Sequence, residues 1–320
     1  MGRYLLRRVL ISIPVVIAIT MATYLIASLA PGDPTTALLN PEQIAELGPE
    51  WVERQRAELG LDKPLAVRYA FWLKELVTGN LGFSFVDREP VADKIADRLW
   101  PTLKLMLTVL GIAVVIGIPV GMLSALKQYS VLDYIVTISG FAAISIPSFF
   151  LGLVLIYIFS LKLGWLPTAG MVTVGQPGSF VDSVRHMVLP ATVLGLAQAA
   201  PLIRYTRSSL LESIRQDYTT TARAKGLSER VVITRHTLRN VLIPIVTIIA
   251  LDFPRLLGGT VIVEQVFAWP GMGTLAISSV FGRDYPVLMA VNLIGALMVV
   301  ASSLLADVIY AFVDPRIKYA

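Results

Sequence analysis

Asp217–Pro244 has the sequence DYTTTARAKGLSERVVITRHTLRNVLIP, a charged and cationic segment between two long apolar runs. Its pattern predicts a short helix, a break and a second helix. Thr219–Lys225 can wind about two turns, and Gly226 supplies the permissive backbone that ends them. Ser228 suits the N-cap of a second helix over Glu229–Leu238. Such regular structure exceeds what a simple connector between membrane spans requires.

The composition excludes the soluble globular class. Of 320 residues, 55% are hydrophobic and 15% are charged, whereas soluble domains carry about a quarter charged residues. A chain of this length can hold about six apolar spans of about twenty residues each. We therefore expect an all-α integral membrane protein with about six transmembrane helices.

The chain divides into four predicted parts. Residues 1–30 form a cytoplasmic N-terminus and a first span, whose apolar run is longer than that of a cleaved signal peptide. Residues 31–101 are polar and net acidic, which predicts a small extracytoplasmic subdomain. Residues 102–312 form the transmembrane domain, with cytoplasmic helices at 217–240, and residues 313–320 form a cytoplasmic tail.

The helices expected within these parts follow from local periodicity. Trp51–Leu59 and Leu65–Val77 have helical apolar spacing in the extracytoplasmic subdomain. The remaining spans are expected at about residues 103–126, 133–161, 187–203, 241–263 and 286–312, the third being interrupted by Pro147.

The distribution of positive charge predicts the orientation. The outer loops after the first contribute only Lys162, Arg185 and Arg283, while most other Lys and Arg residues fall in the predicted cytoplasmic segments. By the positive-inside rule both termini are cytoplasmic. The expected location is the cell (inner) membrane, crossed several times.

Motifs for catalysis, nucleotide binding and metal binding are missing from the sequence. It has no G-x-x-x-x-G-K-[ST] loop, no G-x-S-x-G elbow and no H-E-x-x-H motif. It has no cysteine and two histidines, which excludes disulfides, cysteine ligands and a histidine metal cluster. We expect no catalytic residue, no metal site and no cofactor in this chain.

Three interpretations of Asp217–Pro244 remain open from residue chemistry. The segment could fix topology and contact anionic lipid, it could bind nucleic acid as a helix-turn-helix, or it could dock a soluble partner. The nucleic-acid interpretation is the weakest, because the helix pair is short, lacks a third helix and is tethered at both ends.

The run Tyr218–Arg230, followed by Arg235-His236, Leu238–Asn240 and Ile243-Pro244, resembles the cytoplasmic signature of ABC-importer permeases of the dipeptide/oligopeptide (and nickel) transporter type. Seven further pieces match this family in order: Ala30–Pro34, Leu59–Pro64, Ser145–Phe149, Gly164–Pro167, Val263-Glu264 with Phe267–Gly273, Arg283–Pro286 and Asp314–Arg316.

The match to the wider importer family is partial. That family's motif has Glu-Ala-Ala, three residues, Gly, nine residues, Ile, one residue and Leu-Pro. Aligned on Gly226, this chain agrees only at Ala222, Gly226 and Leu238. The peptide-type branch tolerates these departures and places the proline at Pro244.

The resemblance implies a type I ABC importer permease fold and a docking role for the central stretch. Contacts with the ATP-binding subunits are expected from seven residues: Ala222, Arg223, Ala224, Lys225, Gly226, Glu229 and Arg230. ATP and Mg²⁺ would be bound by those partner subunits, so this chain would not be an enzyme. The other implied partners are a second, homologous permease and an extracytoplasmic substrate-binding protein; no nucleic acid is expected.

The function implied is half of the translocation pathway for di- and oligopeptides. Relatives of this branch also move nickel complexes, oligosaccharides or opines, so these substrates are alternatives. An ATP-independent channel or secondary transporter is the alternative from a different class. No internal repeat typical of many secondary transporters is visible in the sequence.

Charged residues within a predicted span are candidates for the pathway. Asp252 and Arg255 lie in the fifth predicted span, where charges normally face a bundle interior or an aqueous cavity. An Asp252–Arg255 pair at i, i+3 with a purely structural role is the alternative. Gln198 and Ser145 are weaker candidates, because uncharged polar side chains commonly join helices.

The outer edge of the fifth span contains candidates for contact with the binding protein. These are Glu264, Trp269 and Gly271. Aromatic anchoring at the membrane interface is the alternative explanation for Trp269.

Overall fold

The computed structural model describes residues 2–29, 33, 35–36, 43, 46–175 and 178–313, and it leaves the side chains at 2–5, 236, 239, 243–244, 247, 250–259 and 309–313 undescribed. Regular secondary structure in this part of the chain is helical, with one isolated β-bridge between Phe83 and Pro90. The chain forms two compact units, Met1–Thr102 with Pro270–Val300, and Leu103–Trp269 with Ala301–Ala320.

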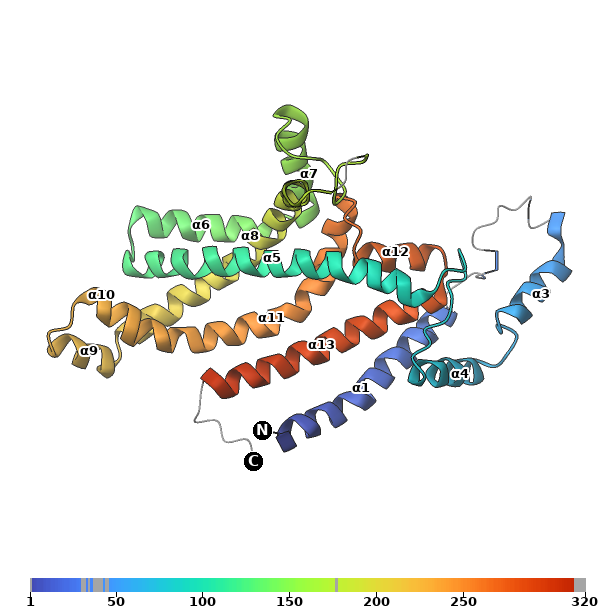
Figure 1. Cartoon of the computed structure of the whole chain (residues 1–320). Helices are drawn as coiled ribbons and strands as arrows, with labels where there is room; N and C mark the ends of the chain where they lie inside the picture. The colour runs from blue at the N-terminus through green and yellow to red at the C-terminus, as the bar shows by residue number, and fades with distance from the viewer. Residues whose placement is uncertain are drawn as a thin grey trace. The chain divides into compact units, whose positions relative to one another are not determined.

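The first unit combines the N-terminal third of the chain with residues 270–300. Its helices are α1 (Gly2–Leu29), α3 (Pro49–Glu58), α4 (Leu65–Val77), the start of α5 (Val91–Leu126), α12 (Met272–Phe281) and most of α13 (Tyr285–Val313) (Figure 1). The two helices predicted within the extracytoplasmic subdomain are confirmed as α3 and α4.

Apolar side chains from distant parts of the sequence form the core of this unit. Val91 and Ile95 at the start of α5 pack with Met272 and Leu275 of α12 and with Val287 of α13. Burial of side chains of this size is worth about 1.5–3 kcal/mol each. The start of α5 is therefore held against the C-terminal helices of the unit.

Asp284 fixes the turn before α5 to the start of α13. Its carboxylate accepts hydrogen bonds from Ser84 Oγ at 2.5 Å and from Phe85 N at 3.0 Å. Asp284 and Ser84 are both buried, so the bonds satisfy groups that would otherwise be costly to remove from water.

The second unit contains the rest of α5 and the helices α6 (Val131–Ser145), α7 (Ser148–Leu155), η1 (Ile156–Lys162), α8 (Phe180–Ile214), α9 (Asp217–Ala224), α10 (Glu229–Val231), η2 (Val232–Thr237) and α11 (Leu238–Val266). Its core joins α5, α8 and α11 through Ala125, Leu202, Leu210, Val241 and Ile245.

Close approach of α5 to α8 depends on glycine. A Cβ atom at Gly121 would lie 2.7 Å from the Ile203 carbonyl oxygen, and one at Gly117 would lie 2.8 Å from Leu202. This small-xxx-small spacing lets two apolar helices pack with their backbones close together. Any side chain at Gly121 would push the helices apart.

The described residues hold four single helices long and apolar enough to cross a membrane, which are α1, α5, α8 and α13. The predicted third span is not one straight helix. It is a pair, Val131–Ser145 and Ser148–Lys162, bent by 103°, because Pro147 cannot donate a helical hydrogen bond and Ile146 is extended. The fifth predicted span is occupied by α11, which is 29 residues long.

Candidate functional site

The central charged segment folds as a helix, a tight break and a second helix, as predicted. Helix α9 ends at Ala224, and Gly226 follows with φ of +78°, in the left-handed region that favours glycine. Ser228 takes the N-cap position of α10, although its side chain makes no capping hydrogen bond. The second helix is longer than predicted, since α10, η2 and α11 run without interruption to Val266.

We call α9, the break at Gly226 and α10 the tip. Buried groups hold the tip to the end of α8. Thr219 is fully buried and donates from Oγ1 to the Ser213 carbonyl oxygen at 2.9 Å. The hydroxyls of Ser213 and Tyr218 are hydrogen-bonded to each other. Val232 at the start of η2 is fully buried and α9 contacts η2, so the tip is attached to both long helices.

An ion pair spans the break between α9 and α10. Arg223 Nε donates to Glu229 Oε1 at 2.6 Å, and Nη2 lies 3.3 Å from Oε2. The hydrogen bond that Arg223 donates to the Glu229 carboxylate raises the pKa of the Arg223 guanidinium above its usual value. The pair links the end of α9 to the start of α10 across Gly226.

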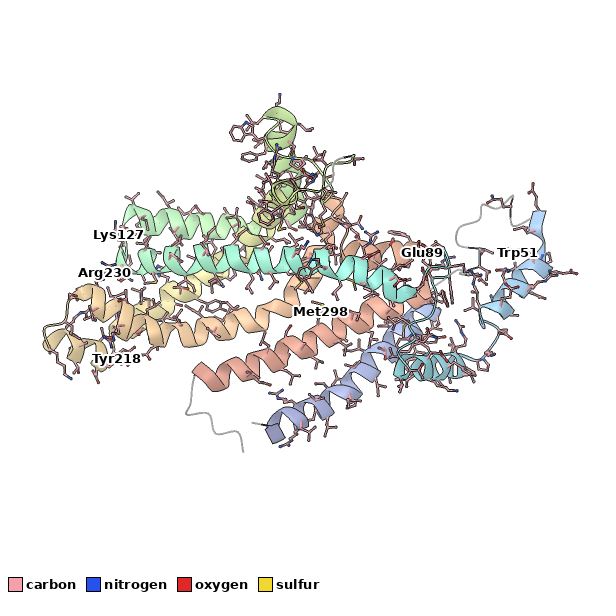
Figure 2. All side chains as sticks on the ribbon, in the orientation of Figure 1. Trp51, Glu89, Lys127, Tyr218, Arg230 and Met298 are labelled. Atoms are coloured by element: carbon pink, nitrogen blue, oxygen red, sulfur yellow. The ribbon has the colours of Figure 1, made fainter. Side chains whose placement is uncertain are left out.

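The seven candidate coupling residues do not share one environment. Ala222 is buried against its own chain, whereas Arg223, Ala224, Lys225, Gly226, Glu229 and Arg230 are exposed. Figure 2 shows Tyr218 and Arg230 at this tip. Six of the seven residues are therefore exposed on this chain, and four of these six are charged.

Exposed apolar side chains on the same tip were missed by the sequence analysis. Tyr218 and Leu227 are each 39% exposed and Val231 is 36% exposed. Each lies within the charged segment. The alternation of apolar and charged residues there was the sequence signal that could have indicated exposed apolar side chains. A polar surface with apolar side chains inside it is typical of a protein interface.

A buried ion pair that the sequence analysis also missed joins α6 to α8. Arg207 Nε and Nη2 each lie 2.8 Å from a different carboxylate oxygen of Asp133. Ser124 Oγ and Tyr129 N donate to the same carboxylate at 2.5 and 3.0 Å. Asp133 is 3% exposed, and we call these four residues the Asp133 clamp. The sequence signal for this ion pair was the presence of an acidic residue, Asp133, in an otherwise apolar predicted helix.

The candidate pathway residues lie on separate helices. Gln198 is half-buried in the middle of α8, and Ser145 is exposed at the last residue of α6, directly before the 103° bend. Asp252 and Arg255 are in α11, but their side chains lie outside the described residues.

The candidate contact residues for a binding protein are buried in this chain. Glu264 and Trp269 have 0% exposed surface, and Gly271 is also buried. Trp269 N donates to the Glu264 carbonyl oxygen at 2.8 Å, which closes the turn after α11. Exposed positions next to them are Gln265 and Ala268.

Ligands for a metal ion do not cluster in the part of the chain that the structure describes, where no group of three His, Asp or Glu side chains could hold one. The exposed charged side chains at the tip can form ion pairs and hydrogen bonds with another macromolecule.

Similar proteins agree with this architecture. The family model for the inner membrane component of binding-protein-dependent transport systems matches residues 117–319, and the model for its N-terminal part matches residues 1–106. The oligopeptide transport system permease protein AppB of Bacillus subtilis (strain 168) is 45% identical over 320 residues, covering 100% of both chains. The glutathione transport system permease protein GsiC of Escherichia coli (strain K12) is 40% identical over 319 residues, again covering 100% of both chains.

A solved structure has the same fold. An inward-facing conformation of the MetNI methionine ABC transporter superimposes with a TM-score of 0.56 and 21% identity, covering 71% of this chain and 99% of that chain. The predicted type I importer fold is thereby confirmed. With family models matched along most of its length, the chain belongs to the family of inner membrane components of binding-protein-dependent transport systems, the multi-pass permeases of ABC importers.

Proposed function

We propose that this chain forms half of the translocation pathway of an ATP-driven importer whose substrates are di- or oligopeptides. The observation that carries the substrate class is the sequence similarity along the whole chain, 45% and 40% identity, to two permeases whose names specify an oligopeptide and glutathione. Both substrates are peptides, although they differ in size. The shared chemistry is a short chain of amide bonds with charged ends.

The partners follow from this proposal. A second, similar permease completes the pathway, and a substrate-binding protein delivers the peptide on the extracytoplasmic side. Two ATP-binding subunits hold ATP and Mg²⁺ and carry out hydrolysis. Both termini of this chain and the α9–α10 tip are cytoplasmic, which agrees with the positive charge of the tip.

The tip formed by α9 and α10 is the proposed docking element for one ATP-binding subunit. Its six exposed candidate residues and the apolar Leu227 provide the contact surface. Because η2 continues into α11 and Thr219 is bonded to α8, a displacement of the tip is passed to both helices. Coupling between ATP hydrolysis and transport requires an element with two conformations, whose equilibrium is shifted both by the ATP-binding subunit and by the substrate pathway.

Asp252 and Arg255 are proposed to line the pathway and to contact the charged ends of the peptide, with Gln198 and Ser145 as weaker pathway positions. At the outer end, the binding protein is proposed to contact the turn containing Glu264, Trp269 and Gly271. Since those three residues are buried, the contact would be made through the exposed neighbours on this turn.

Uptake by the reconstituted importer tests the proposed substrate class. The purified complex in proteoliposomes, with its binding protein outside and ATP inside, is expected to accumulate labelled peptides. An excess of unlabelled peptide should abolish the signal, whereas a nickel chelate, an oligosaccharide or an opine should leave it unchanged. Accumulation without ATP, or competition by one of the non-peptides alone, would overturn the proposal.

The same assay tests Asp252. Asp252→Asn is expected to reduce uptake or change the range of accepted peptides, because it removes the charge that we propose to contact a charged peptide end. Unchanged uptake with an unchanged range would assign Asp252 a purely structural role.

A further inference from the structure

The amphipathic helix α4 is attached to the side of the apolar helix α1. The Tyr69 hydroxyl lies 3.0 Å from Thr20 Oγ1 and 3.2 Å from the Ile17 carbonyl oxygen. The Tyr24 and Tyr69 rings have centroids 5.6 Å apart. These contacts are at residues within the apolar run of α1, which ends at Leu29, so α4 is placed at the level of the membrane rather than in bulk water.

Both helices leave apolar side chains uncovered around this contact. Phe71 on α4 is 51% exposed, and Ile26 and Leu29 on α1 are 72% and 73% exposed. Helices that lie at a membrane interface bury an apolar face about 5–10 Å into the boundary between headgroups and acyl chains. At 1.5 Å per residue, Tyr24 lies about 7.5 Å along the helix axis from Leu29, while Thr20 and Ile17 lie about 13.5 and 18 Å from it. The contacts of α4 therefore extend from that boundary into the apolar stretch of α1.

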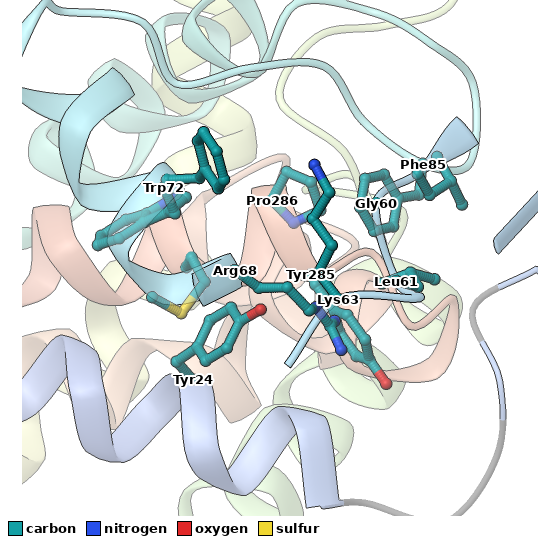
Figure 3. Close-up of a pocket in the computed structure, with 12 residues that line it drawn as sticks. Tyr24, Gly60, Leu61, Lys63, Arg68, Trp72, Phe85, Tyr285 and Pro286 are labelled. Atoms are coloured by element: carbon teal, nitrogen blue, oxygen red, sulfur yellow. The ribbon is translucent and has the colours of Figure 1, made fainter. Parts of the chain in front are cut away.

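A cavity of about 220 Å³ opens at this level, between α1, α4 and the start of α13 (Figure 3). Five aromatic side chains line it, and two phenol groups among them, those of Tyr24 and Tyr285, are hydrogen-bond donors. Among the described residues that line it, Lys63 and Arg68 are charged and none is acidic.

The two cations lie over aromatic rings. Lys63 Nζ is 4.9 Å from the centre of the Phe71 ring, and the Arg68 guanidinium carbon is 5.7 Å from the centre of the Tyr24 ring. The nearby Asp33 carboxylate is engaged by Arg56 and Thr35. The cavity therefore combines two positive charges, phenol donors and apolar walls, which suits an anion with an apolar body.

From this arrangement we infer that the cavity binds the headgroup of an anionic phospholipid, with the phosphodiester beside Lys63 and Arg68 and the acyl chains along the exposed apolar side chains of α1 and α4. The exposed apolar surface next to the cavity favours a lipid over a soluble phosphate, which would not contact it. The inference is independent of the transported substrate.

Lipid binding by the purified, delipidated transporter complex tests the inference. The complex is titrated with mixed micelles that contain phosphatidylglycerol or phosphatidylcholine, and bound lipid is counted by native mass spectrometry. We expect preference for phosphatidylglycerol. Lys63→Gln and Arg68→Gln should each weaken its binding about fivefold, on the order expected for one basic residue at an anionic lipid surface, and leave phosphatidylcholine unaffected.

Lys74→Gln is the matched control, because Lys74 is an exposed cation on α4, the helix that contains Arg68, and is not among the residues that line the cavity. It should bind like the unchanged protein. The charge-preserving pair Lys63→Arg with Arg68→Lys should retain the preference, which separates loss of charge from loss of fold.

Several outcomes would overturn the inference. These are equal binding of the two lipids, an equal loss in Lys74→Gln, or loss of the preference in the charge-preserving pair. Displacement of the lipid by millimolar inorganic phosphate would identify a soluble anion as the ligand, and displacement by a transported peptide would identify the cavity as part of the substrate pathway.

Discussion

Gly226 combines a left-handed backbone with open space around its Cα. Its φ is +78°, and a Cβ atom built there meets no other atom within 4 Å in this chain. A residue with a Cβ in this conformation costs roughly 1–2 kcal/mol, and Asn is among the residues that tolerate it. Within this chain there is room for a side chain at Gly226. If a bulky side chain is not tolerated there, the clash would be with a partner that approaches the tip.

Replacement of Gly226 separates these two effects. Gly226→Trp is expected to leave the chain inserted in the membrane but to abolish ATP-dependent uptake, because the indole blocks close approach of the ATP-binding subunit. Gly226→Asn, which tolerates the backbone conformation and adds less bulk, should retain most of the activity. Uptake in proteoliposomes and the amount of chain in membranes are the measurements. Full uptake by Gly226→Trp would contradict the docking role.

At the scale of elements, the Asp133 clamp holds the turn between α5 and α6 against α8. Tyr129 in this turn has φ of +62°, which is uncommon for a residue other than glycine. Its backbone N–H is bonded to Asp133, and Asp133 is bonded to Arg207 of α8. The strained turn persists because the buried carboxylate satisfies donors on three segments.

Breaking this clamp should be costly and non-additive. Asp133→Asn leaves Arg207 without its charged partner, and loss of one member of a buried pair costs about 3–5 kcal/mol. The Arg207 side chain is 27% exposed, so we expect a value at or below the lower end. In thermal unfolding of the detergent-solubilised complex, the double variant Asp133→Asn with Arg207→Gln should lose less than the sum of the two single variants. Strict additivity would show that the pair does not act as a unit.

The bend between α6 and α7 is also an element-scale feature. Pro147 in the sequence signals an interruption, which was predicted, but the angle of 103° was not. The direction in which α7 leaves α6 is set by its packing on α8 and α11. The local sequence predicts where the helix is interrupted. It does not predict the angle between α6 and α7, because that angle depends on packing against other helices.

At the scale of the whole molecule, affinity purification from native membranes tests the assembly. Extraction in mild detergent is expected to recover one second permease and two ATP-binding subunits with each chain, because we propose that the exposed tip docks such a subunit and the chain has no nucleotide-binding loop. Mass spectrometry with stoichiometry is the measurement. Recovery of the chain alone, or as a homo-oligomer that moves solute without ATP, would favour the channel or secondary-transporter alternative.

The sequence by itself determined the membrane class, the positions of most helices and the helix-break-helix pattern around Gly226. These depend on local properties: the length of apolar runs, helical periodicity and the conformational freedom of glycine. The family resemblance also followed from short motifs in order along the chain, and the family comparison confirms it.

Only the tertiary structure decided which residues are buried or paired. It placed Ala222, Glu264 and Trp269 inside the chain, joined Asp133 to Arg207 across 74 residues, and brought α1, α4 and α13 around one cavity. The physical reason is that burial and ion pairing depend on groups far apart in sequence, and no local pattern specifies which distant side chain will be the neighbour.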